Sequence, residues 1–234
     1  MVQYTERLTT GKLIKRYKRF LADIHLDSGE EITAHLPNTG SMLSTKTPGS
    51  PVAVSYHPSP KRKLKWTLEL VQSEGTWVGV NTSFSNHIVE TSIAAGQIPE
   101  LQGYDTIRRE VTYGTGSRID LLLESRNKRC YVEVKNVTYK KGAGAYFPDA
   151  VTTRGAKHLR ELSDMVKEGH RAVMFFLVNR NDCQFVSPAV QIDPIYSETL
   201  LSASEFGVEI ISWSVEHSLY GCKISRKVPV RLPI

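Results

Sequence analysis

Hydrophobic and polar residues alternate over short stretches in the first eighty positions, and clusters of Gly, Pro and Asn separate these stretches. Alternation of this kind predicts strands with one buried face, and the clusters predict turns. Five strands are expected, over 20–25, 32–36, 52–56, 66–72 and 76–80. Five short strands in about eighty residues are typical of a small β-barrel. An oligonucleotide-binding (OB) type barrel is one candidate, and other small β-folds stay open.

The period of the pattern changes after position 82. The clearest helix lies between Thr153, a candidate N-cap, and Gly169, a candidate terminator. Further helices are predicted over 83–95 and 195–206, and strands over 109–113, 118–124, 130–137, 171–179 and 208–213. The sequence therefore predicts a two-domain chain: a β-barrel over 1–82 and an α/β domain with a central mixed sheet over 83–234.

Composition supports a globular protein, because 40% of the 234 residues are hydrophobic and 23% are charged. The longest apolar run, 172–178, is too short to span a bilayer, and the first twenty residues lack the apolar stretch of a secretory signal. The three cysteines are widely spaced and form no CxxC pair, which argues against a disulfide framework or a zinc ribbon. We therefore expect a cytoplasmic protein without membrane segments.

Basic residues exceed acidic ones by 30 to 24, and this balance weakly favours an anionic partner. The excess is concentrated in two clusters of the first third, and we predict that both contact nucleic acid. The residues are Lys12, Lys15, Arg16, Lys18, Arg19, Lys61, Arg62 and Lys63. Tyr17 and Phe20, interleaved with the first cluster, suit a groove that follows a nucleic-acid strand and stacks its bases. The alternative is that this segment is a charged, solvent-exposed β-strand without a ligand.

Candidate chemistry lies in the segment 116–138. In a strand, side chains two positions apart share a face, so Glu133 and Lys135 project the same way. Asp120 interrupts the preceding apolar strand, and an antiparallel turn through 125–129 would place it beside Glu133. Two carboxylates and one ammonium would then converge at one place.

This combination suits phosphodiester cleavage. Mg²⁺ or Mn²⁺ takes oxygen ligands, often only one or two carboxylates from the protein, and Asp120 and Glu133 are predicted as those ligands. Lys135 would orient the attacking water or neutralise charge in the transition state. Because two carboxylates stand next to it, this ammonium is expected to stay protonated. We predict a catalytic role for all three residues.

An Asp followed thirteen positions later by Glu-x-Lys resembles the PD-(D/E)xK restriction-endonuclease-like superfamily, with Ile119 in place of the usual Pro. The resemblance implies a further acidic site residue, which matches Glu110, and a basic residue on the helix after the motif. The candidates on that helix are Arg154, Lys157 and His158, and we assign Arg154 and Lys157 to nucleic-acid binding. No HxxxH or HExxH pattern contains His158, so zinc binding is not expected.

Five blocks in order resemble the sugar fermentation stimulation protein A family of bacteria and archaea. They are RYKRFLADI, HLPNTGSM, SRIDLLL, YVEVKNVT and AYFPDAVTTRGAKHLREL. The resemblance implies an OB-type barrel followed by a nuclease-like α/β domain, DNA binding, and a regulatory part in sugar catabolism.

The main hypothesis is a Mg²⁺-dependent phosphodiesterase that binds DNA with little sequence preference, RNA remaining open as a partner. The alternative is a non-catalytic DNA-binding regulator of maltose-type sugar catabolism that uses the same basic surface. A sugar-phosphate enzyme is disfavoured, because the sequence has no GxxxxGK[ST] or GxGxxG loop.

Overall fold

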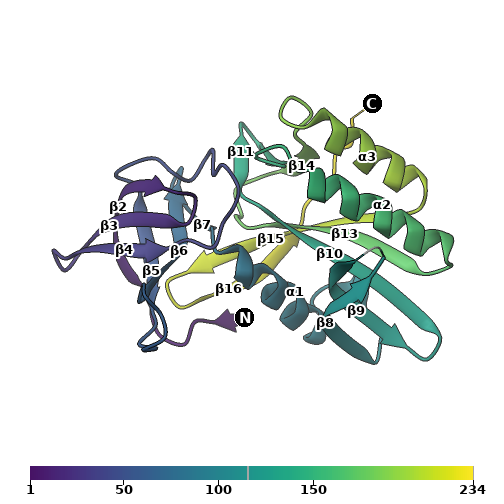
Figure 1. The fold of residues 1–234 in the computed structure, drawn as a ribbon, viewed down its shortest axis with the longest axis horizontal. Coiled ribbons are helices and arrows are strands. Elements are labelled where there is room, and N and C mark those ends of the chain that lie inside the picture. The colour runs from purple at the N-terminus through teal and green to yellow at the C-terminus, as the bar shows by residue number, and fades with distance from the viewer. Residues whose placement is uncertain (115, 234) are drawn as a thin grey trace.

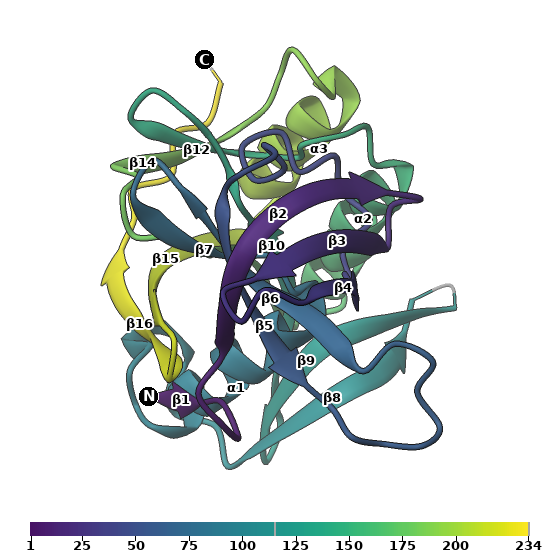
Figure 2. The ribbon, with the colours of Figure 1, turned by 90° about the vertical axis from the view of Figure 1, so that its left-hand side faces the viewer.

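A closed five-stranded barrel forms the N-terminal part of the computed structural model, which describes residues 1–114 and 116–233 (Figure 1). Its strands are β2 (Thr9–Tyr17), β3 (Leu21–Leu26), β4 (Glu31–His35), β5 (Pro51–Tyr56) and β6 (Trp66–Ser73). They pair in the order β4-β3-β2-β5-β6, and a parallel pairing of β4 with β6 closes the ring. Alternate residues of each strand point inward and form one hydrophobic core. Figure 2 shows the barrel facing the viewer.

The barrel differs from the strand prediction in one of its five strands. The predicted strands 20–25, 32–36, 52–56 and 66–72 correspond to β3–β6, but the predicted strand 76–80 is β7 (Thr76–Gly79), which pairs with β6 outside the closed ring. The fifth barrel strand is β2, where the first basic cluster begins. The hydrophobic pattern does not predict β2, because one of its inward positions is Gly11 and not a hydrophobic residue. Glycine is needed there because β3 approaches closely: a Cβ on residue 11 would lie 2.5 Å from the His25 carbonyl oxygen.

A seven-stranded mixed sheet forms the second part. In spatial order it contains β1 (Val2–Gln3), β16 (Gly221–Lys227), β15 (Glu209–Ser218), β13 (Arg171–Val178), β10 (Lys128–Val137), β9 (Ser117–Ser125) and β8 (Thr106–Tyr113). The pairs β10–β13 and β13–β15 are parallel, and the others are antiparallel. The sheet matches the predicted mixed α/β architecture.

Helices cover both faces of this sheet (Figure 1). One face carries α1 (Ser85–Ala94), preceded by the 3₁₀ turn η1 (Thr82–Phe84) and followed by η2 (Pro99–Leu101). The other carries α2 (Thr153–Lys167) and α3 (Pro194–Glu205). Helix α2 buries Ala156, Leu159, Leu162 and Met165 at intervals of three residues. Its N-cap is Thr152, which accepts a hydrogen bond from the Gly155 N–H, and not Thr153 as predicted.

Several elements escaped prediction because they are short or polar. No strand was predicted between 138 and 152, but this segment contains β11 (Tyr139–Lys141) and β12 (Gly144–Phe147), which form a small sheet with β14 (Phe185–Pro188). Strands β1 and β16 were also missed. The predicted domain boundary after residue 82 falls inside η1, and β1 pairs with β16 of the second sheet. In the described part of the chain, no helix is long and apolar enough to cross a membrane.

A network of ion pairs within the second domain reaches the barrel through Lys140 and Glu74. Arg180, fully buried, donates to both Asp182 oxygens at 2.6 and 2.8 Å and to the Thr138 carbonyl at 3.2 Å. Lys140 donates to Asp182 at 2.8 Å and to Glu74, in the β6–β7 turn of the barrel, at 2.6 Å. Although burial opposes it, hydrogen bonds from Arg180 and Lys140 lower the pKa of Asp182 to about 2.

We predict that Asp182→Ala lowers the free energy of unfolding by about 3–5 kcal/mol, because it leaves the Arg180 charge buried without its partner. Urea denaturation measures this loss. Asp164→Ala removes an exposed ion pair with Lys167 and should cost less than about 1 kcal/mol. In the wild type, the stabilising contribution of Asp182 is present above its unfolded-state pKa of 3.8 and is lost as pH falls toward 2. Equal losses in the two variants would contradict this account.

Candidate active site

The pairing of β9 with β10 brings Asp120 beside Glu133. The antiparallel register ends with Leu121 opposite Val132, so the next positions along the two strands are Asp120 and Glu133. One Asp120 oxygen accepts a hydrogen bond from the Val134 N–H at 2.8 Å. The other accepts from the side-chain amide of Asn86, on α1, also at 2.8 Å. Both carboxylates line the same cavity.

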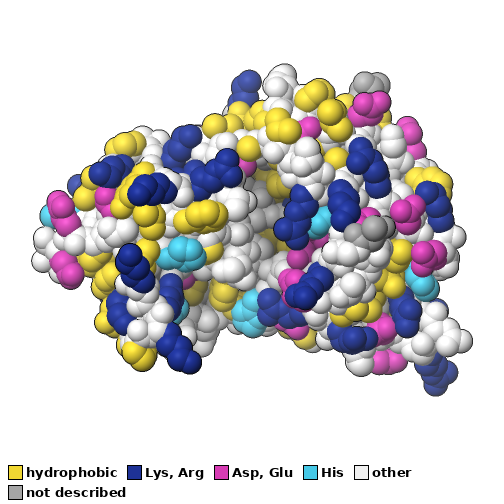
Figure 3. Space-filling model, viewed as in Figure 1, with side chains coloured by type: hydrophobic (Ala, Val, Ile, Leu, Met, Phe, Trp, Pro, Cys, Tyr) yellow, Lys and Arg dark blue, Asp and Glu magenta, His cyan; other side chains and the backbone are white. Residues whose placement is uncertain are grey.

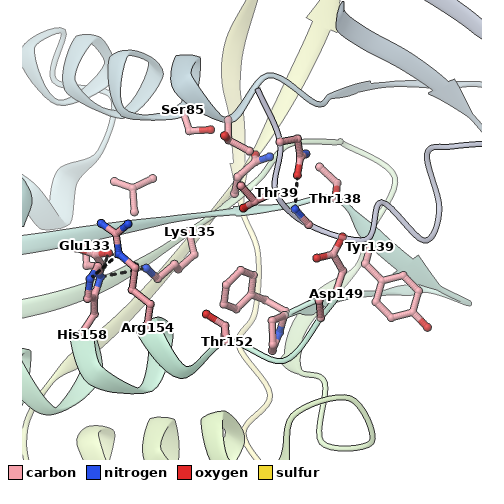
Figure 4. A pocket seen from close by; sticks show the side chains of 18 of the residues that line it. Thr39, Ser85, Glu133, Lys135, Thr138, Tyr139, Asp149, Thr152, Arg154 and His158 are labelled. Carbon is pink, nitrogen blue, oxygen red and sulfur yellow. Dashed lines mark hydrogen bonds and ion pairs between the residues drawn. The ribbon is translucent and has the colours of Figure 1, made fainter. Parts of the chain in front are cut away.

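Glu133 is the centre of a buried charge cluster (Figure 4). Its Oε1 accepts a hydrogen bond from the Lys135 Nζ at 2.6 Å and is also paired with His158 Nδ1 on α2. Arg154, one helical turn before His158, donates to His158 Nε2 at 3.2 Å. Because a guanidinium can only donate, Nε2 must accept, which places the histidine proton on Nδ1. This proton faces Glu133 Oε1, which lies much closer to Nδ1 than the Lys135 ammonium does at 3.4 Å. His158 therefore serves Glu133 as a hydrogen-bond donor.

The two carboxylates titrate in opposite directions. Burial, reinforced by the neighbouring Glu133 charge, raises the pKa of Asp120 to about 6. Burial would also raise the pKa of Glu133, but Lys135 and the hydrogen bond from His158 outweigh it and lower that pKa. Glu133 is therefore ionised at neutral pH, whereas Asp120 exchanges its proton just below neutrality. Divergent pKa values in adjacent buried acids are common at functional sites.

The donor set fits a hard divalent cation. Glu133 Oε2 is buried and has no hydrogen-bond partner, although it carries the charge of an ionised carboxylate. An oxygen in this state costs free energy unless a cation or a donor satisfies it. Among residues 1–114 and 116–233, no group of three or more His, Cys, Asp and Glu side chains could hold a metal. Two carboxylates suit Mg²⁺ or Mn²⁺, which retains water and substrate ligands, better than a closed structural zinc site.

The cavity lies between the two domains and has a volume of about 390 Å³. The sheet supplies Asp120, Glu133 and Lys135, and the barrel supplies the loop that follows β4, including Thr39. In Figure 4, Thr39 and Ser85 approach from the side opposite Arg154 and His158. Ser85 Oγ is a second buried polar atom without a partner. Sequence reasoning did not identify the contributions of Thr39, Ser85 or Asn86, since each depends on the contact between domains or between α1 and β9.

Glu110 lies near this cluster but outside the first cavity. Its neighbours Arg109 and Val111 pair with Leu121 and Ile119, which leaves Glu110 opposite Asp120 without a ladder partner. The backbone of Glu110 has φ +53°, a left-handed conformation that costs roughly 1 kcal/mol or more for a residue with a side chain. The Glu110 side chain is exposed and lines a second cavity of about 430 Å³ with Arg118, Arg154, Lys157 and His158. A site role for Glu110 stays a prediction.

The predicted nucleic-acid-binding residues occupy different environments. Lys12, Lys15, Lys18, Arg19, Lys61, Lys63, Arg154 and Lys157 are exposed, and Arg16 and Arg62 are partly buried. Arg62 donates to Thr67 Oγ1 at 2.7 Å. Lys15 pairs with Asp23 and Lys157 with Glu161. Figure 3 shows basic side chains on both rims of the hollow between the domains.

Arg16 has a structural partner that sequence could not indicate. Its guanidinium donates to the Asn38 carbonyl at 3.0 Å and to the Gly40 carbonyl at 2.8 Å. From the other domain, Asp149 accepts a hydrogen bond from the Met42 N–H at 2.7 Å. The loop 38–42 is thus held from both sides, with Thr39 at the cavity.

Residues 14–80 match the family model described as the SfsA N-terminal OB domain, and residues 83–221 match the model described as the sugar fermentation stimulation protein RE domain. The chain belongs to the sugar fermentation stimulation protein family. The fold class predicted from sequence, an OB-type barrel followed by a restriction-endonuclease-like α/β domain, is confirmed.

Relatives in this family match over nearly the whole chain. A sugar fermentation stimulation protein homolog of Geotalea uraniireducens is 54% identical over 225 residues, which cover 96% of this chain and 97% of the relative. The homolog of Paramagnetospirillum magneticum is 54% identical over 214 residues, 91% of each chain. The solved structure of SfsA from Pyrococcus furiosus in complex with Ca²⁺ has a TM-score of 0.90, 25% identity and 99% coverage of each chain.

The raised pKa of Asp120 generates a prediction for metal affinity. Below about pH 6, Asp120 is protonated and a proton must leave before an ion can bind, so the apparent affinity for Mn²⁺ should fall about tenfold per pH unit. Above pH 6 the affinity should level off. Calorimetric titration of the full chain between about pH 5 and about pH 8 measures this. An affinity independent of pH over that range, or unaltered in Asp120→Asn, would contradict the assignment.

Proposed function

We propose that this protein is a divalent-metal-dependent phosphodiesterase that acts on DNA. The observation that carries the proposal is the buried, ionised Glu133, whose Oε2 has no partner in a cavity that also contains Asp120 and Lys135. Basic side chains on both rims of the cleft favour a polyanionic substrate. Because DNA is the expected substrate, we also propose a cytoplasmic location.

Mg²⁺ or Mn²⁺ is the proposed ion, with Asp120 and Glu133 as its protein ligands. The related Pyrococcus furiosus protein was solved with Ca²⁺, another hard ion that binds oxygen ligands. A bound ion of this kind would polarise the phosphoryl oxygen and lower the pKa of a coordinated water. Proton loss from Asp120 near pH 6 suits binding at neutral pH.

The chain's own side chains have distinct proposed roles. Lys135, whose Nζ donates to Glu133 at 2.6 Å, would place its ammonium where negative charge builds up on the phosphoryl group. His158 and Arg154 fix the orientation of Glu133 through the relay of hydrogen bonds, which makes them positioning residues. Asn86 does the same for Asp120. Glu110 is proposed to contact the site from the second cavity.

DNA would be held mainly through phosphates. The exposed lysines of β2 and of the β5–β6 loop provide point charges on the barrel, and Arg154 and Lys157 provide them on α2. Phosphate contacts carry no sequence information, so binding should have little sequence preference and should weaken steeply with salt. RNA presents the same phosphates and stays an open substrate.

We predict metal-dependent strand cleavage that is lost in two variants. Lys135→Ala and Asp120→Asn should each lower the cleavage rate at least about a hundredfold, the effect expected on removal of one electrostatic contact to the transition state. The assay uses nicked, structured and single-stranded DNA with Mg²⁺ or Mn²⁺, and a matched reaction with chelator.

Lys141→Ala is a suitable control, because it removes an exposed lysine on β11 that does not line the cavity. It should leave the cleavage rate within about twofold of wild type. Failure of the wild type to cleave any DNA or RNA substrate with any divalent ion would remove the enzymatic proposal.

A non-catalytic DNA-binding regulator of sugar catabolism is the second candidate. The observation in its favour is that three of the four carboxylate oxygens of Asp120 and Glu133 already accept hydrogen bonds from the chain. Under this alternative, Lys135→Ala preserves the cellular effect, and charge removal at Lys15, Arg16 and Arg19 abolishes DNA retention.

A further inference from the structure

A separate cavity of about 570 Å³ lies on the outer face of the barrel, next to the cleft of the candidate active site. Its walls come from the N-terminal segment before β2, from β4–β6 and from η1. The volume is within the range of small-molecule sites. No residue of the proposed catalytic set lines it.

Three kinds of recognition group meet in this cavity. Aromatic rings provide flat surfaces: Tyr4 stacks on Phe84 at a centroid distance of 5.6 Å, and Tyr56 packs on Trp66 at 4.9 Å, leaving half of Tyr56 exposed. Arginines provide positive charge, from Arg7 and Arg62.

The third group is a buried acceptor. Glu69 is 6% exposed; its Oε1 accepts from Ser55 Oγ at 2.7 Å and its Oε2 from the Asn81 amide at 2.8 Å. Burial raises the pKa of Glu69 despite these bonds and the nearby Arg62. A further N–H donor from a ligand would stabilise the carboxylate, since each of its oxygens can accept more than one hydrogen bond.

One ligand chemistry satisfies all three groups. A nucleotide has a planar base that stacks on aromatic rings, an anionic phosphate that pairs with arginine, and base N–H groups that donate to a carboxylate. A sugar phosphate has the phosphate but lacks the planar base with N–H donors. The aromatic walls therefore favour the nucleotide.

A thin partition separates this cavity from the catalytic cleft. Pro37 and Phe84 line the outer cavity, and their chain neighbours Asn38 and Ser85 line the cleft. The partition is held by the Thr82 hydroxyl, which donates to the Pro37 carbonyl at 2.6 Å. The two cavities therefore lie on opposite sides of the same short segments of chain.

We propose that the outer cavity binds one unstacked nucleotide, with its base against Tyr56 or Tyr4, its N–H edge toward Glu69 and its phosphate near Arg62 and Arg7. This deepens the proposed function and rests on it where the nucleotide belongs to a strand held in the cleft. The same chemistry would accept a free mononucleotide, and the experiment distinguishes these two sources.

The test measures binding to the full chain by calorimetry in the presence of chelator, so that no cleavage is needed. The probes are a single-stranded DNA tetranucleotide, 5′-dAMP and glucose 6-phosphate. We expect Glu69→Ala, Tyr56→Ala and Arg62→Ala each to weaken tetranucleotide binding at least tenfold. Tyr56 and Arg62 are not fully buried, so their variants should fold even if Glu69→Ala does not. Arg160→Ala, which removes an exposed charge on α2 outside both cavities, should change binding less than twofold.

If 5′-dAMP binds with the same dependence on Glu69 and Arg62, the cavity accepts a free nucleotide; if only the tetranucleotide does, the nucleotide comes from a strand. Either result supports the site. Unchanged tetranucleotide affinity in both Tyr56→Ala and Arg62→Ala would overturn it, and so would measurable glucose 6-phosphate binding at least as tight as that of 5′-dAMP. Failure of the catalytic proposal is seen separately: the wild type would cleave no strand with Mg²⁺ or Mn²⁺ and would still bind the tetranucleotide in chelator through Tyr56 and Arg62.

Discussion

The antiparallel register of β9 and β10 is the constraint on which the candidate site depends. It places two acidic side chains opposite each other, Glu133 buried and Asp120 partly buried, where neither charge would be tolerated without partners. Lys135 and His158 donate hydrogen bonds to Glu133, and Arg154 donates to His158. At Asp120, burial and the Glu133 charge raise the pKa instead. A shift of one residue in β10 would turn the Glu133 side chain away from His158 on α2 and separate it from Asp120.

The barrel contributes lining residues to the cavity of the candidate site. The loop after β4 reaches the cavity because Arg16 holds it from the barrel and Asp149 holds it from the second domain. Lys140, paired with Glu74 and Asp182, joins the domains at another point. These polar contacts fix the position of the barrel surface relative to the carboxylates. They would therefore also fix the position of a substrate bound on that surface.

Local patterns predicted most of the elements and the proximity of Asp120, Glu133 and Lys135. The alternation in YVEVK places Glu133 and Lys135 on the same face of a strand. The turn between β9 and β10 is short, so the two strands pair as a hairpin that brings Asp120 opposite Glu133. What could not be predicted depends on contacts distant in sequence. The sequence of β2 indicates only a charged segment, because its place in the barrel depends on pairing with β3 and β5. The sequence alone gives His158 as a helix-surface residue, and its contact with Glu133 depends on the packing of α2 over β10. Thr39 lines the cavity only because the loop after β4 contacts the second domain.

Anomalous diffraction from crystals of the full chain soaked in Mn²⁺ tests the central claim most directly. The account predicts one peak within coordination distance of both Glu133 Oε2 and an oxygen of Asp120, at roughly the 2.0–2.2 Å typical of hard cations of this size. The peak should disappear in Glu133→Gln crystals. A peak at another place, or none at saturating Mn²⁺ at neutral pH, would contradict it.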